Sequence, residues 1–129
     1  MKREFEDKVA IVTGGGSGIG EAIALELGSG GAEVVVADLS LDAAERVAAR
    51  LRDAGARAHA FAVDVADAAA VEKMVDFAVE KAGGLHLAVN NAGIGGASAA
   101  TADYPLDSWR QVIDVNLHGV FYGMKFEIA

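Results

Sequence analysis

The residues best suited to chemistry lie in a glycine-rich segment, where residues 13–20 read TGGGSGIG directly after the apolar run 9–12. Gly14, Gly18 and Gly20 follow the spacing GxxxGxG. Glycine tolerates the positive φ angles of a tight turn, and the N-terminus of a following helix offers free N–H groups and a partial positive charge. The segment therefore predicts a pyrophosphate site. Taken alone, a glycine-rich turn without a ligand is the alternative.

An acidic side chain follows the second apolar run of the chain. Asp38 comes directly after residues 34–37, about 20 residues beyond the glycine segment, where nucleotide-binding folds place a ribose-binding acid. Its carboxylate can accept hydrogen bonds from both hydroxyls of an adenosine ribose and would repel a 2′-phosphate. Neither Arg nor Lys lies within residues 13–20 or directly after Asp38. Asp38 therefore predicts NAD in preference to NADP, and a solvated strand-end acid is the alternative for Asp38 alone.

These groups need a scaffold that brings strand ends together, and the hydrophobic pattern indicates one. Short apolar runs occupy residues 9–12, 34–37, 60–63 and 85–89. Continuous runs of this length are typical of strands buried on both faces of a parallel sheet. Helical periodicity separates the runs, so the element order predicts a doubly wound α/β sheet with right-handed crossovers.

Local signals indicate where the intervening helices begin and end. Ser40 and Asp67 are expected to cap the second and third helices, and Gly55 and Gly83 to end them. The first helix is expected over about residues 17–27, with its last turn frayed by the glycines that follow.

The last helix is expected from about residue 107 toward the end of the chain, after a loop-like stretch at residues 97–102. Asn116 shares a face of this helix with apolar residues, so we expect the amide to be buried and hydrogen-bonded. Trp109 and Phe121 are interpreted as helix packing residues. His86, at the start of the fourth strand, is interpreted as structural.

Composition limits the classes of partner and site. Residues 1–129 are expected to form a single domain, since no linker or repeat interrupts the pattern. The net charge of −8 argues against a nucleic-acid or anionic-membrane partner. The absence of cysteine excludes disulfides and thiol catalysis, and the three histidines lack ligand spacing, so no metal site is expected. No apolar run is long enough for a signal peptide or a membrane span, and the cytoplasm is the expected location.

Four blocks resemble, in order and spacing, the short-chain dehydrogenase/reductase family from residue 8 to about residue 128. They are residues 13–20, Asp64-Val65 after the third strand, the sequence NNAG at residues 90–93, and Asn116 in the last helix. The resemblance implies a Rossmann-type doubly wound parallel sheet with helices on both faces, incomplete within this chain, with strand order 3-2-1-4. It also implies hydride transfer between a nicotinamide cofactor and an alcohol, sugar or ketone.

The resemblance assigns a role to each matching residue. The implied cofactor-binding residues are Gly14, Ser17, Gly18, Ile19, Gly20, Asp38, Asp64, Val65, Asn90, Ala92 and Gly93. The glycine segment would line the pyrophosphate, and Asp64 and Val65 would contact the adenine. Asn90, Ala92 and Gly93 would border the cofactor and steady the central strand, although a plain strand-to-loop turn is the alternative for Asn90 and Asn91. Asn116 would be an active-site residue that kinks its helix and positions a water in a proton relay.

The chain departs from the family where the chemistry should occur. In the family, a later Ser and a Tyr-x-x-x-Lys helix serve proton transfer at the substrate oxygen, with the Lys lowering the pKa of the Tyr. Here Tyr104 is followed four residues later by Ser108, and Tyr122 by Phe126. Residues 1–129 are therefore interpreted as a C-terminally truncated NAD(P)-binding domain without turnover of its own.

Such a shortened sheet would leave residues 85–89 as an apolar edge strand. Family members bury the outer face of the last helix in a subunit contact, so Phe121 and Met124 would be exposed, and homo-oligomerisation or aggregation is expected. The alternative to an oxidoreductase is a module that binds NAD(H) without catalysis. A Rossmann methyltransferase is a weaker alternative, because the NNAG block has no role in it.

Overall fold

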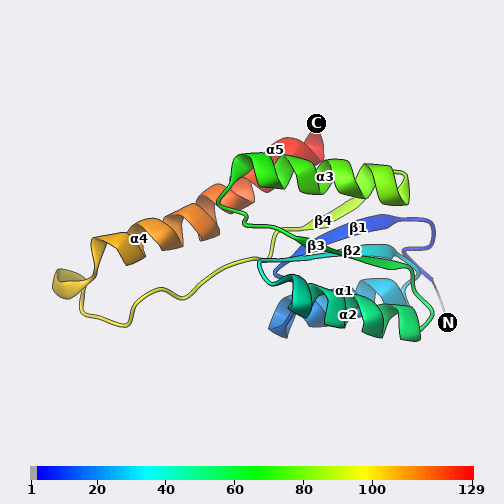
Figure 1. The fold of residues 1–129 in the computed structure, drawn as a ribbon, viewed down its shortest axis with the longest axis horizontal. Helices are drawn as coiled ribbons and strands as arrows, with labels where there is room; N and C mark the ends of the chain where they lie inside the picture. Colours follow the sequence, from blue (N-terminus) through cyan, green and yellow to red (C-terminus); the bar gives the residue numbers. More distant parts are fainter. Residues whose placement is uncertain (1–2) are drawn as a thin grey trace.

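The computed structural model describes residues 3–129, in which strands and helices alternate as predicted (Figure 1). The strands are β1 (Val9–Thr13), β2 (Glu33–Asp38), β3 (Ala58–Ala62) and β4 (Leu87–Val89). The helices between them are α1 (Gly18–Ser29), α2 (Leu41–Asp53) and α3 (Ala68–Ala82). After β4 come a 3-10 turn (Thr101–Asp103), α4 (Leu106–Ile113), a π-helical turn (Asp114–His118) and α5 (Gly119–Ile128).

The four strands form one parallel sheet in the order β3-β2-β1-β4, which confirms the predicted fold class and strand order. Helices α1 and α2 cover one face of the sheet, and α3 and α5 cover the other (Figure 1). Val34 and Val36 of β2 pack toward α1 and α2, whereas Val35 packs toward α3. All three are fully buried, which explains why this strand is a continuous apolar run and not an alternating one.

The two outer strands differ from their predicted ranges. β3 begins at Ala58 and not at residue 60, and β4 is shorter than residues 85–89. His86 precedes β4, and its backbone N–H donates to the Val9 carbonyl at 2.9 Å. Its ring Nδ1 accepts from the Val9 N–H, also at 2.9 Å. The imidazole thus takes the place of a backbone acceptor beside β1, which confirms the interpretation of His86 as structural.

Most predicted helix ends are confirmed. Ser40 and Asp67 cap α2 and α3 through side-chain oxygens that accept backbone N–H groups, and Gly83 ends α3 with a φ of 87°. The expected fraying of the first helix is wrong, because α1 continues to Ser29. Gly28 is buried there, and a Cβ at this position would overlap the side chain of Leu51. Close packing of α1 on α2 therefore outweighs the low helix propensity of glycine.

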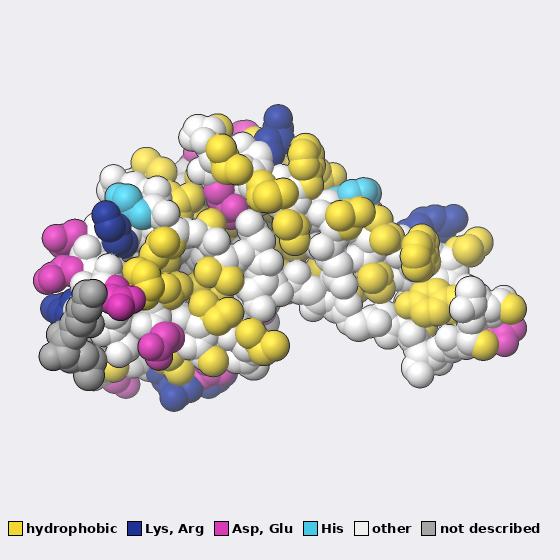
Figure 2. Space-filling model, turned by 180° about the vertical axis from the view of Figure 1, so that it is seen from behind, with side chains coloured by type: hydrophobic (Ala, Val, Ile, Leu, Met, Phe, Trp, Pro, Cys, Tyr) yellow, Lys and Arg dark blue, Asp and Glu magenta, His cyan; other side chains and the backbone are white. Residues whose placement is uncertain are grey.

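The segment after β4 forms an arm that extends beyond the sheet and carries α4 (Figure 1). Trp109 is 59% exposed and Phe121 56% exposed, so the interpretation of both as packing residues is wrong within this chain. The Trp109 and Tyr104 rings pack nearly at right angles, with centroids 6.4 Å apart. The expected exposure of Phe121 and Met124 is confirmed, and Figure 2 shows apolar side chains along the arm.

Candidate functional site

A cavity of about 740 Å³ lies at the carboxyl ends of the parallel strands, where α/β sheets bind their ligands. Its volume is in the range of small-molecule and cofactor sites. The lining residues are Gly14, Ser17, Gly18, Ile19, Asp38, Leu39, Val63, Asp64, Val65, Ala66, Asn91, Ala92, Gly93, Ile94, Asp107, Arg110, Gln111, Asp114 and Val115. The structure thus brings most of the expected site residues together, whereas Gly20, Asn90 and Asn116 do not line the cavity.

The glycine segment forms a tight turn between β1 and α1. Gly14 and Gly18 have φ angles of 63° and 57°, in the left-handed region that favours glycine. A Cβ on Gly18 would meet nothing within 4 Å, which leaves space for a ligand at the turn. A Cβ on Gly20 would overlap the Gly14 carbonyl, so Gly20 allows the helix to lie against the turn rather than contacting the cavity.

The N-terminus of α1 opens into the cavity. Ser17 is its N-cap residue, yet its side chain makes no capping hydrogen bond. In α2 and α3, by contrast, Ser40 and Asp67 accept first-turn N–H groups. The first N–H groups of a helix have no partner within the helix, and together with the helix dipole they favour an anion. This end of the cavity is therefore suited to a phosphate group.

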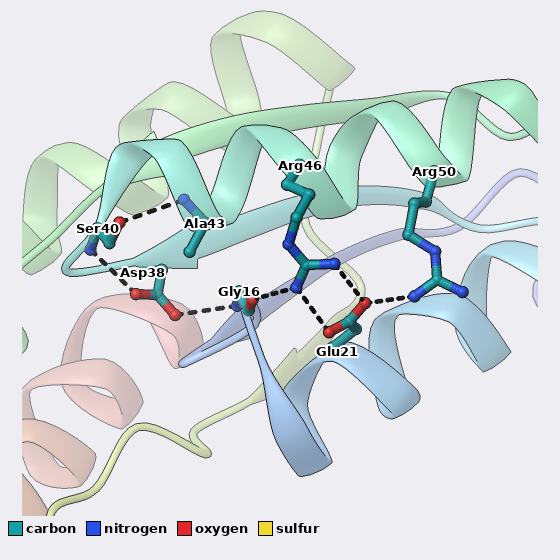
Figure 3. A network of polar contacts seen from close by, with 7 residues as sticks. All are labelled: Gly16, Glu21, Asp38, Ser40, Ala43, Arg46 and Arg50. Atoms are coloured by element: carbon teal, nitrogen blue, oxygen red, sulfur yellow. Dashed lines mark hydrogen bonds and ion pairs between the residues drawn. The ribbon is translucent and has the colours of Figure 1, made fainter.

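Asp38 lies at the end of β2 and lines the cavity beside this turn (Figure 3). Its Oδ2 accepts the Gly16 N–H at 2.9 Å, and its Oδ1 accepts the Ser40 N–H at 3.0 Å. Each carboxylate oxygen can accept a further hydrogen bond. Asp38 therefore has a fixed orientation and still has the capacity to bind a pair of hydroxyls.

A network of charged side chains braces the turn from outside the cavity (Figure 3). Arg46 of α2 donates through Nη2 to the Gly16 carbonyl at 3.0 Å and to Glu21 Oε1 at 2.9 Å. Arg50 also donates to Glu21. The hydrogen bond from Arg46 holds the pKa of the Glu21 carboxyl below its usual range. The sequence signal for this network is weak: it is two arginines four residues apart, which share one face of a helix.

Thr13 and Asn91 join the ends of β1 and β4, and sequence analysis assigned no specific role to either. The Thr13 hydroxyl accepts the N–H groups of Asn91 and Ala92 at 3.0 and 3.1 Å. The Asn91 amide donates to the carbonyls of Thr13 and Gly14 at 3.1 and 3.3 Å. These bonds fix the glycine turn against the start of the NNAG block.

Asn90 points away from the cavity, toward α5. Its amide donates to Glu127 Oε1 at 2.8 Å, and a Cβ on Gly123 would overlap it. Glu127 Oε2 is buried without a hydrogen-bond partner, and burial raises the pKa of this carboxyl. This position fits the expected role of Asn90 in bracing the strand, and Asn90 is not among the residues that line the cavity.

Asn116 lies in the π-helical turn, so the expected distortion of its helix is present. The expected burial is wrong, because the residue is exposed. Its amide is nevertheless paired twice with the backbone of Ile94: Oδ1 accepts the Ile94 N–H at 2.8 Å, and Nδ2 donates to the Ile94 carbonyl at 2.9 Å. Asn116 thus holds a lining residue of the cavity in place, and π-helical turns of this kind are frequent at functional sites.

Within residues 3–129, no group of three or more acidic or histidine side chains is arranged to hold a metal ion. The same part of the chain has no helix of the length and hydropathy that crossing a membrane requires.

Comparison with known proteins gives one consistent result. The family model for short chain dehydrogenase matches residues 8–128. The chain is 44% identical to a cyclohexanol dehydrogenase from Acinetobacter sp. (strain SE19) over 128 residues, which cover 99% of this chain and 51% of the relative. It is 40% identical to a meso-2,3-butanediol dehydrogenase from Serratia marcescens, over 96% of this chain and 48% of the relative.

A solved structure is also similar. The crystal structure of a short chain dehydrogenase/reductase from Burkholderia phymatum in complex with NAD matches with a TM-score of 0.91 at 39% identity. The match covers 95% of this chain and 43% of the other. The chain therefore spans about half the length of the curated relatives it matches.

Proposed function

Because the chain belongs to the short chain dehydrogenase family, we propose that it binds NAD in the cavity and forms the nucleotide-binding part of an NAD-dependent oxidoreductase. The observation that carries this proposal is the place of Asp38. Its carboxylate lines the cavity beside the glycine turn and the uncapped N-terminus of α1. An acid in that position favours a ribose with free hydroxyls over one that carries a 2′-phosphate.

The other lining residues have complementary roles in this proposal. Gly14, Gly18 and the first turn of α1 hold the pyrophosphate by backbone N–H groups. Asp64 and Val65 contact the adenine, the former by its carboxylate and the latter by packing. Asn116 acts on the cavity through Ile94, to whose backbone it is bound.

Bound NAD supplies a hydride acceptor, and the family's chemistry also needs a proton carrier at the substrate oxygen. These 129 residues contain no Tyr-x-x-x-Lys sequence. We therefore expect them to bind NAD without turnover, and to act on an alcohol or ketone only together with residues that supply the Ser, Tyr and Lys. Cyclohexanol and butanediol, in the names of two relatives, are secondary alcohols, and we extend that substrate class to this protein.

The alternative function is a module that binds NAD(H) and does no chemistry. The two are separated by mixing the chain with a polypeptide that carries the Ser and Tyr-x-x-x-Lys segments of a relative. NAD reduction by the mixture with a secondary alcohol supports the oxidoreductase. Binding without turnover in every mixture supports the module.

The experiment that tests the proposed function is calorimetric titration of the 129-residue chain with NAD and, separately, with NADP. We expect saturable binding of NAD and weaker binding of NADP. Absence of NAD binding by the folded chain, or tighter binding of NADP, would contradict the proposal.

A further inference from the structure

We propose that Glu21 is a second determinant of cofactor selectivity: it holds the Arg46 guanidinium on the glycine turn and so keeps it from a nucleotide 2′-phosphate. The inference rests on the proposed NAD site, since it concerns the ribose end of the same cavity. Glu21 acts through Arg46 and is therefore a positioning residue.

Gly16 connects Arg46 to the ribose-binding acid. Its carbonyl accepts from Arg46 Nη2 at 3.0 Å, while its N–H donates to Asp38 Oδ2 at 2.9 Å. A Cβ on Gly16 would lie 2.8 Å from both Asp38 Oδ2 and the Ala43 Cβ, so α2 approaches the turn closely here. Arg46 follows Ala43 by three residues, on the same side of the helix. One residue thus separates its guanidinium from the carboxylate that would meet the ribose.

The charge on Arg46 would favour the cofactor that this site is proposed to reject. Arginine is the residue best suited to bind phosphate, because its planar donors match the phosphate oxygens. The Arg46 side chain is 54% exposed, so it has room to move. Among the lining residues of the cavity the basic side chain is Arg110, which is paired with Asp107 on the arm. Arg46 is therefore the cation that a 2′-phosphate beside Asp38 would recruit.

Glu21 prevents this by occupying the guanidinium. Its carboxylate accepts from both Nη1 and Nη2 of Arg46 and from Arg50 (Figure 3). The Glu21 side chain is only 15% exposed, and the hydrogen bond from Arg46 lowers its pKa, so it stays ionised at neutral pH. Selectivity then has two sources: Asp38 repels the 2′-phosphate, and Glu21 keeps Arg46 paired.

The test is Glu21→Gln in the 129-residue chain, with the Kd of NAD and of NADP measured by calorimetry. Glutamine keeps the size of the side chain and removes the charge. We expect the affinity for NADP to rise about five- to tenfold and that for NAD to change less than about twofold. Adding Arg46→Gln should cancel the gain, and high salt should reduce it. Glu26→Gln is the matched control, because Glu26 is an exposed acid on the same helix.

Three results would overturn the inference: an unchanged selectivity ratio in folded Glu21→Gln, a gain in NADP affinity that survives in the double variant, or an affinity for NADP that falls more than about twofold relative to that for NAD in Arg46→Gln alone. The last variant stays informative if Glu21→Gln does not fold, because Arg46 braces the turn for both nucleotides and should not contribute to selectivity while Glu21 holds it. A wild-type chain that binds neither nucleotide would instead overturn the proposed function, and this inference with it.

Discussion

At the scale of single residues, Asp38 combines a fixed orientation with unused hydrogen-bonding capacity. Both of its oxygens are held by backbone N–H groups, from Gly16 and Ser40. Backbone donors carry no net charge, so they orient the carboxylate without neutralising it. The two ribose hydroxyls can therefore donate to two oriented carboxylate oxygens, whereas a 2′-phosphate would be repelled by the full negative charge of the same carboxylate.

For Asp38→Ala we expect the affinity for NAD to fall about 10- to 100-fold, because hydrogen bonds to a charged group contribute about 1.5–3 kcal/mol. The preference over NADP should weaken, because Glu21 still holds Arg46, and Asp38→Arg should reverse it. Titration of each variant with both nucleotides measures this. Asp42→Ala is the control, since it removes an exposed acid from the first turn of α2. Selectivity that is the same in wild type and Asp38→Ala would contradict the assignment.

At the scale of elements, a hydrogen bond between Asn90 and Glu127 joins the end of β4 to α5. Asn90 donates to Glu127 Oε1, while Glu127 Oε2 is buried without a partner. Burial disfavours the charged form of a carboxyl, and this raises its pKa in the folded state. The folded chain then binds a proton that the unfolded chain has already released. The free energy of unfolding therefore falls as pH rises from about 4.5 through the folded pKa of Glu127. Above that pKa this loss of stability is constant.

Glu127→Gln should remove this pH dependence, because glutamine keeps the Oε1 acceptor for Asn90 and has no charge. We expect the variant to be more stable than wild type at pH 7, by at most about 1 kcal/mol because the carboxyl is only partly buried. The difference should vanish below the unfolded pKa of the glutamate. Urea denaturation from pH 4 to pH 8 measures it, with the exposed Glu80→Gln of α3 as control. A stability difference that is equal at all pH values would count against the buried-charge explanation.

At the scale of the whole molecule, the sheet and the arm leave apolar surface uncovered. In the described part of the chain, β4 pairs with β1 on one side only. On the helix that follows the arm, Phe121 is 56% exposed and Met124 44% exposed, and Leu117 on the preceding turn is 59% exposed. Contiguous exposed apolar side chains of this kind mark interaction surfaces.

We expect the chain to self-associate through this surface, in a concentration-dependent manner. The double change Phe121→Glu and Met124→Glu should shift the population toward monomer, because it places charge on the apolar face. Sedimentation velocity over a range of protein concentrations measures the shift. Leu41→Glu is the control, as Leu41 is 52% exposed on α2, across the sheet. A wild-type chain that stays monomeric at all concentrations would contradict the expectation.

The sequence alone was sufficient for the features that depend on local physics. Apolar runs predicted the strands, and the side chains of Ser40 and Asp67 predicted the N-termini of α2 and α3, because a cap bonds within its own helix. The spacing of the glycines predicted the turn, since Gly14 and Gly18 adopt the positive φ that this geometry needs. The family resemblance supplied the strand order and about half of the residues that line the cavity.

Only the tertiary structure decided the features that depend on which elements meet. Asn90 and Asn91 are chemically identical, and both follow β4. The packing of α5 places Asn90 against Glu127, whereas Asn91 binds the glycine turn. The extension of α1 through Gly28 depends on Leu51 of another helix. The pairing of Glu21 with Arg46 joins residues 25 positions apart, and its place beside Asp38 follows from the approach of α2 to the turn. Such contacts are set by the relative positions of whole elements, which no local sequence pattern encodes.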